Sequence, residues 1–306
     1  MLKACIQKIA SSLPGSASVN FALRRYVSRT LPVSSDTFND MLFISEKHYG
    51  FFLRHSPAES LLNPVFFEFG AGWDLISQLY FHARGIKKQC AVDIKPHAKI
   101  ALINDAIERL HRHTQKADGH IDKKATSHAL ASMAELNTLF GINYLAPCDM
   151  RKTNFPSASF DFISSTATLE HIPAKDLALI LAECRRLLKP DCIISCLIDP
   201  KDHFAYCDRH VSTYNFLKFS DRQWAFFNSS LHFQNRLRYP DYVNMFQNAG
   251  FEILVCEAEQ PTDSDMAGLK SLRINNKFSD SLEDLGVKTI WVVARKKQLS
   301  SFEGGA

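Results

Sequence analysis

A short run of acidic and glycine residues follows an apolar stretch that begins near position 65. It reads Glu68-Phe69-Gly70-Ala71-Gly72-Trp73-Asp74. Two glycines one residue apart let the chain turn sharply, and a ligand can approach them without meeting a Cβ atom. A helix that follows such a loop points its first N–H groups at the ligand. Asp93 ends the next apolar run, where a carboxylate can accept hydrogen bonds from both hydroxyls of a ribose. These residue types predict a site for a nucleotide-like ligand.

The spacing of the glycines distinguishes two classes of nucleotide. A dinucleotide fingerprint needs a third glycine at position 75, where this chain has Leu75. Glu68 stands two residues before the first glycine, where a carboxylate can orient an ammonium group directly or through the loop. An ammonium group beside a ribose describes S-adenosylmethionine better than it describes a pyrophosphate.

A second group of polar residues follows the apolar run that ends at Ile198. The segment 199–240 contains Asp199, Asp202 and His203 among interleaved aromatic residues. Because the pKa of a histidine lies near neutral, His203 could take a proton from an acceptor hydroxyl, with either aspartate orienting its ring. It could equally stabilise this segment through hydrogen bonds, or contact a substrate without moving a proton.

Other polar residues have two interpretations each. Arg236 and Arg238 could clamp a carboxylate or phosphate of the acceptor, or they could form ion pairs at the surface or at a helix end. His171 is expected to cap a helix start or pack against it rather than to act in catalysis. No cysteine or histidine pattern has the spacing of a zinc site, so no metal is predicted.

Apolar periodicity predicts the elements that position these residues. In the clearest helix Leu177, Ile180 and Leu181 share one face, and Pro190 ends the helix. Strands that alternate with helices indicate an α/β fold, with a Rossmann-like, mostly parallel, seven-stranded sheet and helices on both faces. We expect strands at 65–69, 89–94, 142–145, 160–165, 192–198, 251–256 and 289–294, and further helices at 74–83, 97–110, 125–140 and 241–248.

Three segments in this order resemble a class I S-adenosylmethionine-dependent methyltransferase, of the kind whose substrates are unassigned. They are FEFGAGWD at 67–74 with Asp93 behind it, Cys148-Asp149-Met150 followed by FPSASFDFI at 155–163, and TATLEHIP at 166–173 before the helix that ends LLKP. The resemblance covers about residues 62–295 and implies S-adenosylmethionine as the cofactor. One departure concerns Asp74, where the family often has glycine; its bulk and charge would reshape the loop or cap the next helix.

The same resemblance implies a role for each matching residue. The residues that it assigns to the cofactor are Glu68, Gly70 and Gly72 at the methionine end, Asp93 at the ribose, Asp149 and Met150 at the adenine, and Ser165 or Thr166 near the methionine.

The composition excludes several classes of protein. The chain has 306 residues, of which 46% are hydrophobic and 22% charged, and these values argue against disorder, collagen and arrays of short repeats. A formal net charge of +4 is too small to predict a nucleic-acid partner. No apolar run has the roughly 20 residues of a transmembrane helix. Eight cysteines without a CxxC pair predict buried, reduced thiols, and hence a reducing, cytoplasmic location.

Two regions are expected: an N-terminal basic helical arm or lid at 1–60, and a methyltransferase domain at 61–298 with an acceptor-side insertion at about 199–240. Residues 1–35 hold five basic side chains, seven serines and no acidic residue. Such a segment could rest on the main domain, contact an anionic surface such as a membrane periphery, or serve in targeting.

Together these features predict an enzyme that transfers a methyl group from S-adenosylmethionine to a small-molecule acceptor, at oxygen. Two alternatives stay open. One is a non-catalytic partner subunit that keeps the fold. The other is a nicotinamide-dependent oxidoreductase, against which Leu75 and the 149–163 pattern count. RNA or protein as the acceptor stays open through the basic arm, and the oligomeric state is not predicted.

Overall fold

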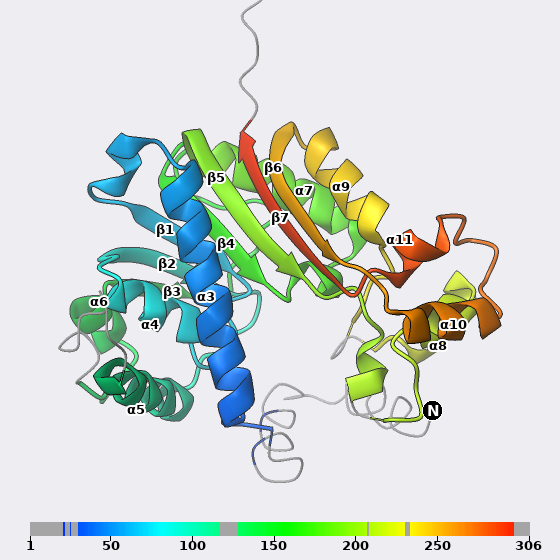
Figure 1. Cartoon of the computed structure of the whole chain (residues 1–306). Coiled ribbons are helices and arrows are strands. Elements are labelled where there is room, and N and C mark those ends of the chain that lie inside the picture. The colour runs from blue at the N-terminus through cyan, green and yellow to red at the C-terminus, as the bar shows by residue number, and fades with distance from the viewer. Residues whose placement is uncertain are drawn as a thin grey trace, which may run out of the picture.

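The computed structural model describes Phe21, Arg25 and residues 30–116, 128–206, 208–229 and 233–296 (Figure 1). The strands of this part form one 7-stranded sheet in the order β3-β2-β1-β4-β5-β7-β6. Strands β1 to β5 pair in parallel, and β7 runs antiparallel to both β5 and β6. The predicted α/β, Rossmann-like, mostly parallel sheet is confirmed. Its strands are β1 (Val65–Phe69), β2 (Lys88–Val92), β3 (Ile142–Leu145), β4 (Phe160–Thr166), β5 (Leu188–Ile198), β6 (Phe251–Glu259) and β7 (Thr289–Lys296).

Helices cover both faces of the sheet (Figure 1). Successive side chains of a strand point to opposite faces, so Phe66 and Phe162 pack on one side while Phe67 and Ile163 pack on the other. Because both faces are covered, the strands read as continuous apolar runs. The first face is covered by α3 (Ser35–His55), α4 (Ile76–Ala83), α5 (Ile100–Lys116) and α6 (Glu135–Phe140), and the second by α7 (Ala174–Leu187) and α9 (Tyr239–Asn248).

The helix α3 crosses the sheet obliquely and is part of its core (Figure 1). The side chain of Ser34 accepts a hydrogen bond from the N–H of Thr37 and so caps the helix start. Phe52 lies with its ring centroid 4.7 Å from that of Phe66 and is 1% exposed. Each large apolar side chain buried in this way contributes about 1.5–3 kcal/mol, so α3 holds firmly to the sheet.

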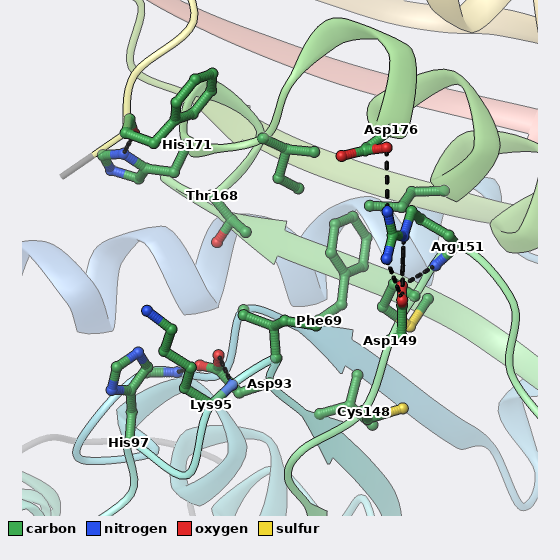
Figure 2. Close-up of a pocket in the computed structure, with 18 of the residues that line it drawn as sticks. Phe69, Asp93, Lys95, His97, Cys148, Asp149, Arg151, Thr168, His171 and Asp176 are labelled. Carbon is green, nitrogen blue, oxygen red and sulfur yellow. Dashed lines mark hydrogen bonds and ion pairs between the residues drawn. The ribbon is translucent and has the colours of Figure 1, made fainter. Parts of the chain in front are cut away.

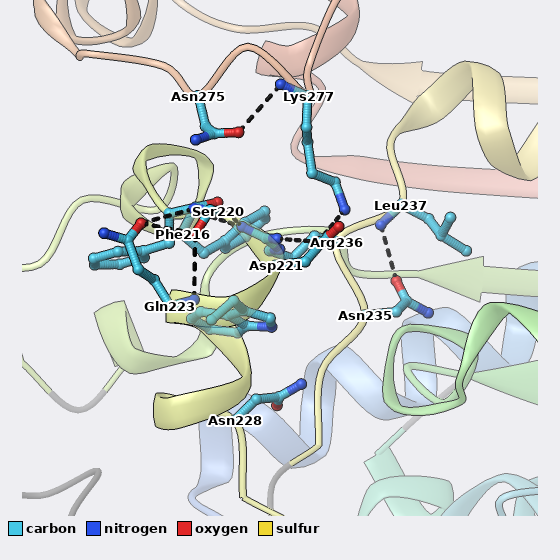
Figure 3. A network of polar contacts seen from close by, with 12 residues as sticks. Phe216, Ser220, Asp221, Gln223, Asn228, Asn235, Arg236, Leu237, Asn275 and Lys277 are labelled. Atoms are coloured by element: carbon cyan, nitrogen blue, oxygen red, sulfur yellow. Dashed lines mark hydrogen bonds and ion pairs between the residues drawn. The ribbon is translucent and has the colours of Figure 1, made fainter.

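A small lobe lies beside the carboxyl ends of β5 and β6. It consists of the helices α8 (Asp221–Phe227), α10 (Asp263–Ser271) and α11 (Leu282–Gly286), with its own apolar cluster around Phe216 and Trp224. Figure 3 shows how Arg236 ties this lobe to the loop before α9. The guanidinium donates to the carbonyls of Phe216 and Phe219 and pairs with Asp221.

The second arginine of this loop, Arg238, is 1% exposed. It donates to the carbonyls of Pro200, Leu285 and Val287. Both arginines therefore hold the lobe together. The expected ion pair at a helix end describes Arg236, which pairs with Asp221 at the start of α8. It does not describe Arg238, whose buried guanidinium bonds to backbone carbonyls instead.

Several expected elements differ in their limits. The helix expected at 97–110 spans Ile100–Lys116, and the strand expected at 192–198 begins at Leu188. The helix expected at 125–140 begins at Glu135 in the described part. Residues 128–130 before it have no regular structure, and residues 131–134 form a bend and a turn. Residues 117–127 lie outside the described residues. The helix expected to stop at Pro190 ends at Leu187, and β5 begins at once. Pro190 is tolerated there because the register between β4 and β5 shifts at this point.

The described cysteines carry no disulfide. They are Cys90, Cys148, Cys184, Cys192, Cys196 and Cys256; Cys5 and Cys207 lie outside the described residues. Burial raises the pKa of the Cys90 thiol to about 12, so it stays protonated and unreactive. Among the helices of the described residues, none has the length and apolar character needed to cross a bilayer.

Candidate cofactor and acceptor site

A cavity of about 570 Å³ opens where β1, β2, β3 and β4 end (Figure 2). The strand order reverses between β1 and β4, and open α/β sheets bind their ligands at such a switch point. Four loops supply the walls. The lining residues include Gly70, Gly72 and Trp73 after β1, Asp93, Lys95 and His97 after β2, Cys148 to Arg151 after β3, and Ala167, Thr168 and His171 after β4.

The loop after β1 depends on its first glycine. Gly70 has a φ of 76° and its N–H donates to the carbonyl of Val92 at 2.9 Å. A Cβ atom at this position would lie 2.2 Å from Oγ1 of Thr168, a distance that no packing allows. Gly72 also has a positive φ, of 75°, but its missing Cβ faces open space. Gly70 therefore brings the loops after β1 and β4 together, while Gly72 leaves room above the loop.

Leu75 stands where a dinucleotide fingerprint would have its third glycine. Its φ is 53°, in the left-handed region, and its side chain is 0% exposed in the core. Leu75 itself is the N-cap of α4, so Asp74 precedes the cap and does not provide it.

Asp93 links the first two loops. Its Oδ2 accepts from the N–H of Gly72 at 3.3 Å and its Oδ1 from the N–H of Lys95 at 3.2 Å. Burial raises the pKa of this carboxyl, although His97 and the backbone N–H groups oppose that effect. The carboxylate is thus fixed at the wall of the cavity, where Figure 2 shows it beside Lys95 and His97.

Asp149 lies on the opposite wall, paired with Arg151 (Figure 2). The guanidinium of Arg151 donates to both oxygens of Asp149, with Nη2 2.6 Å from Oδ2, and it also reaches Oδ1 of Asp176 at 3.3 Å. Arg151 holds the pKa of Asp149 below its usual range. Met150, between them, is 6% exposed and lines the cavity from the core of the domain.

Glu68, Ser165 and Thr166, three of the predicted cofactor residues, are not among the residues that line this cavity. Ser165 is 0% exposed, and its Oγ donates to the carbonyl of Phe69 at 3.0 Å. Glu68 is 6% exposed, and its Oε2 accepts from Oγ of Ser164 at 3.1 Å. Burial raises the pKa of Glu68 to about 8, against the smaller effect of that hydrogen bond. Thr166 places its Oγ1 3.1 Å from Nε2 of His48 on α3. The next residues, Ala167 and Thr168, face the cavity instead.

His203 lies just beyond the cavity, in a 3₁₀ turn at His203–Tyr206. Its Nε2 is 3.5 Å from Oδ2 of Asp199. Burial acts to raise the pKa of Asp199, but His203, Lys201 and Tyr206 outweigh it and leave that pKa lowered. The ring centroids of His203 and His171 are 4.9 Å apart, and His171 lines the cavity. The sequence-predicted His203 and Asp199 are therefore brought together next to the cavity.

The segment 233–235 holds these two histidines side by side. The carbonyl of Phe233 lies 2.8 Å from Nδ1 of His171, and Oε1 of Gln234 accepts from the backbone N–H of His203. The side chain of Asn235 donates to the carbonyls of Leu169 and Ile172 at 2.9 Å each. Contacts far apart in the sequence thus fix this corner of the site.

Glu170 is a feature that the sequence reasoning passed over. It is 0% exposed, and neither carboxylate oxygen has a hydrogen-bond partner among the described residues. Burial raises the pKa of this carboxyl well above its ordinary value, although the nearby N–H groups of Glu170 itself and of Asp199 act in the opposite direction. The signal was the Glu-His pair inside TATLEHIP, of which only His171 was given an interpretation of its own.

The fold is Rossmann-like, and its cavity lies at the switch point of the sheet, where folds of this class bind nucleotide-like ligands. Residues 67–196 match the family model of a methyltransferase domain. The recognition of a class I S-adenosylmethionine-dependent methyltransferase domain is thereby confirmed for this segment, and it implies S-adenosylmethionine as the cofactor. No curated protein matches the chain.

Solved structures with a similar arrangement of elements are remote in sequence. An S-adenosylmethionine-dependent methyltransferase from Methanosarcina mazei is 14% identical, with a TM-score of 0.41 over 78% of this chain and 94% of that one. A second, from Mesorhizobium loti, is 13% identical, with a TM-score of 0.42 over 81% and 97%. A protein from Pyrococcus horikoshii OT3 is 12% identical, with a TM-score of 0.48 over 90% and 98%.

Proposed function

We propose that this chain is an enzyme that transfers the methyl group of S-adenosylmethionine to an oxygen atom of a small-molecule acceptor. The observation that carries the proposal is the meeting of three groups at one cavity: the Gly70–Gly72 loop, the carboxylate of Asp93 and the carboxylate of Asp149. A turn with two glycines, an acceptor for ribose hydroxyls and an acceptor for an amino group match the parts of this cofactor.

Within this proposal the cofactor lies along the cavity from Asp149 to the glycine loop. Asp149 accepts from the adenine amino group with Met150 beside the ring, and Asp93 accepts from the ribose hydroxyls. Glu68 and Thr166 do not line the cavity, and we propose that they act on the cofactor indirectly. The side chain of Glu68 is hydrogen-bonded to that of Ser164, and the side chain of Thr166 to that of His48. Both would support the methionine end through these neighbouring side chains.

The acceptor is proposed to bind at the His171 end, between the cavity and the small lobe. Methyl transfer requires the acceptor oxygen to line up behind the methyl carbon, opposite the sulfur, and positioning supplies much of the rate. His203 is the proposed base: it takes the hydroxyl proton, and Asp199 stabilises the imidazolium that forms. The oxygen then bonds to the methyl carbon while the electron pair of the breaking C–S bond stays on sulfur.

The segment before α3 is proposed to act as an arm or lid. The methyltransferase domain, proposed at residues 61–298, packs α3 into its core as well. The ring of Phe21 stacks on that of Trp73, with centroids 5.6 Å apart, and Trp73 lines the cavity. A contact of this kind supports a segment that lies across the cofactor site. Most of residues 1–29 lie outside the described residues.

The unpaired cysteines support a reducing compartment, and we place the enzyme in the cytoplasm on that ground.

The acceptor class is tested by separating a cell extract into small-molecule, RNA and protein fractions. Each is incubated with the purified chain and S-adenosylmethionine carrying a ¹³C-labelled methyl group. We expect S-adenosylhomocysteine to form with the small-molecule fraction alone, and the ¹³C chemical shift of the product to be that of an O-methyl group. Labelling of RNA or protein would contradict the small-molecule acceptor, and an N-methyl product would contradict the oxygen target.

His203→Ala tests the base. It should lower turnover at least 10-fold while the affinity for S-adenosylmethionine and the unfolding temperature stay near those of the parent chain. A loss of stability equal to the loss of turnover would assign His203 a structural role instead.

A further inference from the structure

Three side chains with metal-binding atoms meet at the acceptor end of the cavity. Glu170 and His171 come from the turn after β4, and His203 comes from the turn after β5. One ligand atom of each lies within 4.8 Å of those of the other two. A Zn²⁺ ion binds nitrogen and oxygen ligands at about 2.0–2.2 Å, so two ligands of one ion stand no more than about 4.4 Å apart. The separation of at most 4.8 Å is close to this limit.

The carboxylate of Glu170 is the second, independent sign of a missing partner. The side chain is 0% exposed, and neither of its oxygens has a hydrogen-bond partner of ordinary geometry within the part of the chain that the structure describes, although the N–H groups of Glu170 and Asp199 lie near it. A carboxyl buried in this way either gives up its charge or keeps it with the help of a cationic partner, such as a metal ion. A divalent cation held by the two histidines would provide that partner.

The surroundings of the histidines also suit ligation. Nδ1 of His171 lies 2.8 Å from the carbonyl of Phe233, and a ring that donates from Nδ1 carries its lone pair on Nε2. A backbone carbonyl on the second nitrogen is the usual support of a metal-bound histidine, because it fixes the ring and its tautomer. Asp199, 3.5 Å from Nε2 of His203, would support the ring of His203 in the same way.

We propose that Glu170, His171 and His203 bind a divalent transition-metal ion of the zinc class at the acceptor end of the cavity. Two histidines and one carboxylate are the donor set of sites that keep a coordination position open for water or substrate. Because His171 lines the cavity, the open position would face it.

The role of the ion rests on the proposed function, whereas its binding does not. An acceptor hydroxyl bound to the ion would lose its proton to solvent more readily, since a divalent cation lowers the pKa of a bound oxygen. That oxygen would then take the methyl carbon, and the C–S electron pair would remain on sulfur. With the ion bound, His203 would serve as a ligand, and the metal would replace it as the means of deprotonating the acceptor.

The test uses the full chain without a histidine tag, stripped of metal by a chelator. Calorimetry with Zn²⁺ should show one ion bound per chain, and Co²⁺ should give the visible absorption of a nitrogen- and oxygen-ligated ion. Glu170→Gln, which keeps the size of the side chain, and His203→Ala should each weaken binding at least 10-fold. His210→Ala is the matched control, because this exposed histidine lies in the same segment outside the cluster, and it should bind as the parent does.

The absence of a bound ion in the parent chain, or equal affinity in Glu170→Gln and the parent, would overturn the metal site. The affinity for S-adenosylmethionine, measured separately on the same metal-free sample, shows whether the proposed function fails as well. Intact cofactor binding without metal binding would contradict the proposed metal site and leave the proposed function standing.

Discussion

The guanidinium of Arg151 donates hydrogen bonds to both oxygens of the Asp149 carboxylate, with Nε 3.0 Å from Oδ1 and Nη2 2.6 Å from Oδ2. The backbone N–H of Arg151 also donates to Oδ1, at 2.9 Å. Asp149 is the residue that we propose accepts the adenine amino group. An incoming adenine must therefore share this carboxylate with Arg151 or displace the guanidinium from it.

This pairing predicts opposite effects for two substitutions. Arg151→Ala should leave the affinity for S-adenosylmethionine unchanged or raise it up to about 5-fold, because it frees the carboxylate. Asp149→Ala should lower the affinity about 10-fold, which corresponds to about 1.4 kcal/mol. Calorimetric titration measures both, with Arg112→Ala on α5 as the control for loss of an exposed, paired arginine. An equal loss in Arg151→Ala and Asp149→Ala would mean that Arg151 positions the carboxylate rather than competing for it.

The first glycine of the loop should tolerate no side chain. Gly70→Ala places a Cβ 2.2 Å from Oγ1 of Thr168 and also strains a backbone with φ of 76°, so we expect cofactor binding to fall below detection. Gly85→Ala is the matched control: its φ is 93°, and its Cβ would meet nothing within 4 Å. Both variants carry the backbone strain, and their difference in affinity isolates the clash. Similar binding by the two would contradict the close approach of the loops.

Asp93→Ala should weaken S-adenosylmethionine binding by about 1–3 kcal/mol, the usual cost of losing hydrogen bonds to a charged group. Asp93→Asn keeps one acceptor oxygen and should show a smaller loss. Because the backbone N–H groups of Gly72 and Lys95 also bond to this carboxylate, circular dichroism and the unfolding temperature must show that each variant folds. Unchanged affinity in a folded Asp93→Ala would remove the ribose assignment.

Stability should fall as the pH drops below neutral because of His48. This ring is fully buried on α3 between Ser195 and Thr166, and burial, with Lys47 beside it, lowers its pKa to about 3. In the unfolded chain the pKa is near 6.5. Between pH 6.5 and 3 the unfolded chain therefore binds a proton at His48 that the folded protein does not bind. As a result, the contribution of His48 to stability is complete above pH 6.5 and decreases as the pH falls toward 3.

His48→Gln removes this titration. Denaturant unfolding at pH 7 and pH 5 should show that the loss of stability between the two is about 1–2 kcal/mol smaller in the variant than in the parent chain. The variant should also be less stable at pH 7, since the hydrogen bonds to Ser195 and Thr166 change. An identical pH dependence in both proteins would contradict a neutral, buried His48.

The sequence predicted the sheet and the loops at its edge because both follow from local patterns. Apolar runs mark buried parallel strands, and the end of each strand places Gly70, Asp93 and Asp149 at one edge. What it could not predict depends on distant contacts. Thr166 turns toward His48 because α3 crosses the sheet there, and His171 meets His203 because the segment 233–235 bonds to both turns.

Dependence on distant contacts also explains why the sequence left two interpretations open for Arg236 and Arg238. Their carbonyl partners lie in Phe216, Pro200 and Leu285, far from them in the chain, and no local pattern identifies such partners. Glu170 stayed unnoticed because a carboxylate in a helix-start motif reads as an exposed cap, whereas here it is fully buried.

The most direct test of the central claim is calorimetric titration of the purified chain with S-adenosylmethionine, S-adenosylhomocysteine and NADH. We predict micromolar binding of the first two, one molecule per chain, and no heat from NADH. Binding of NADH alone, or of none of the three, would contradict a cofactor site built from Gly70, Asp93 and Asp149.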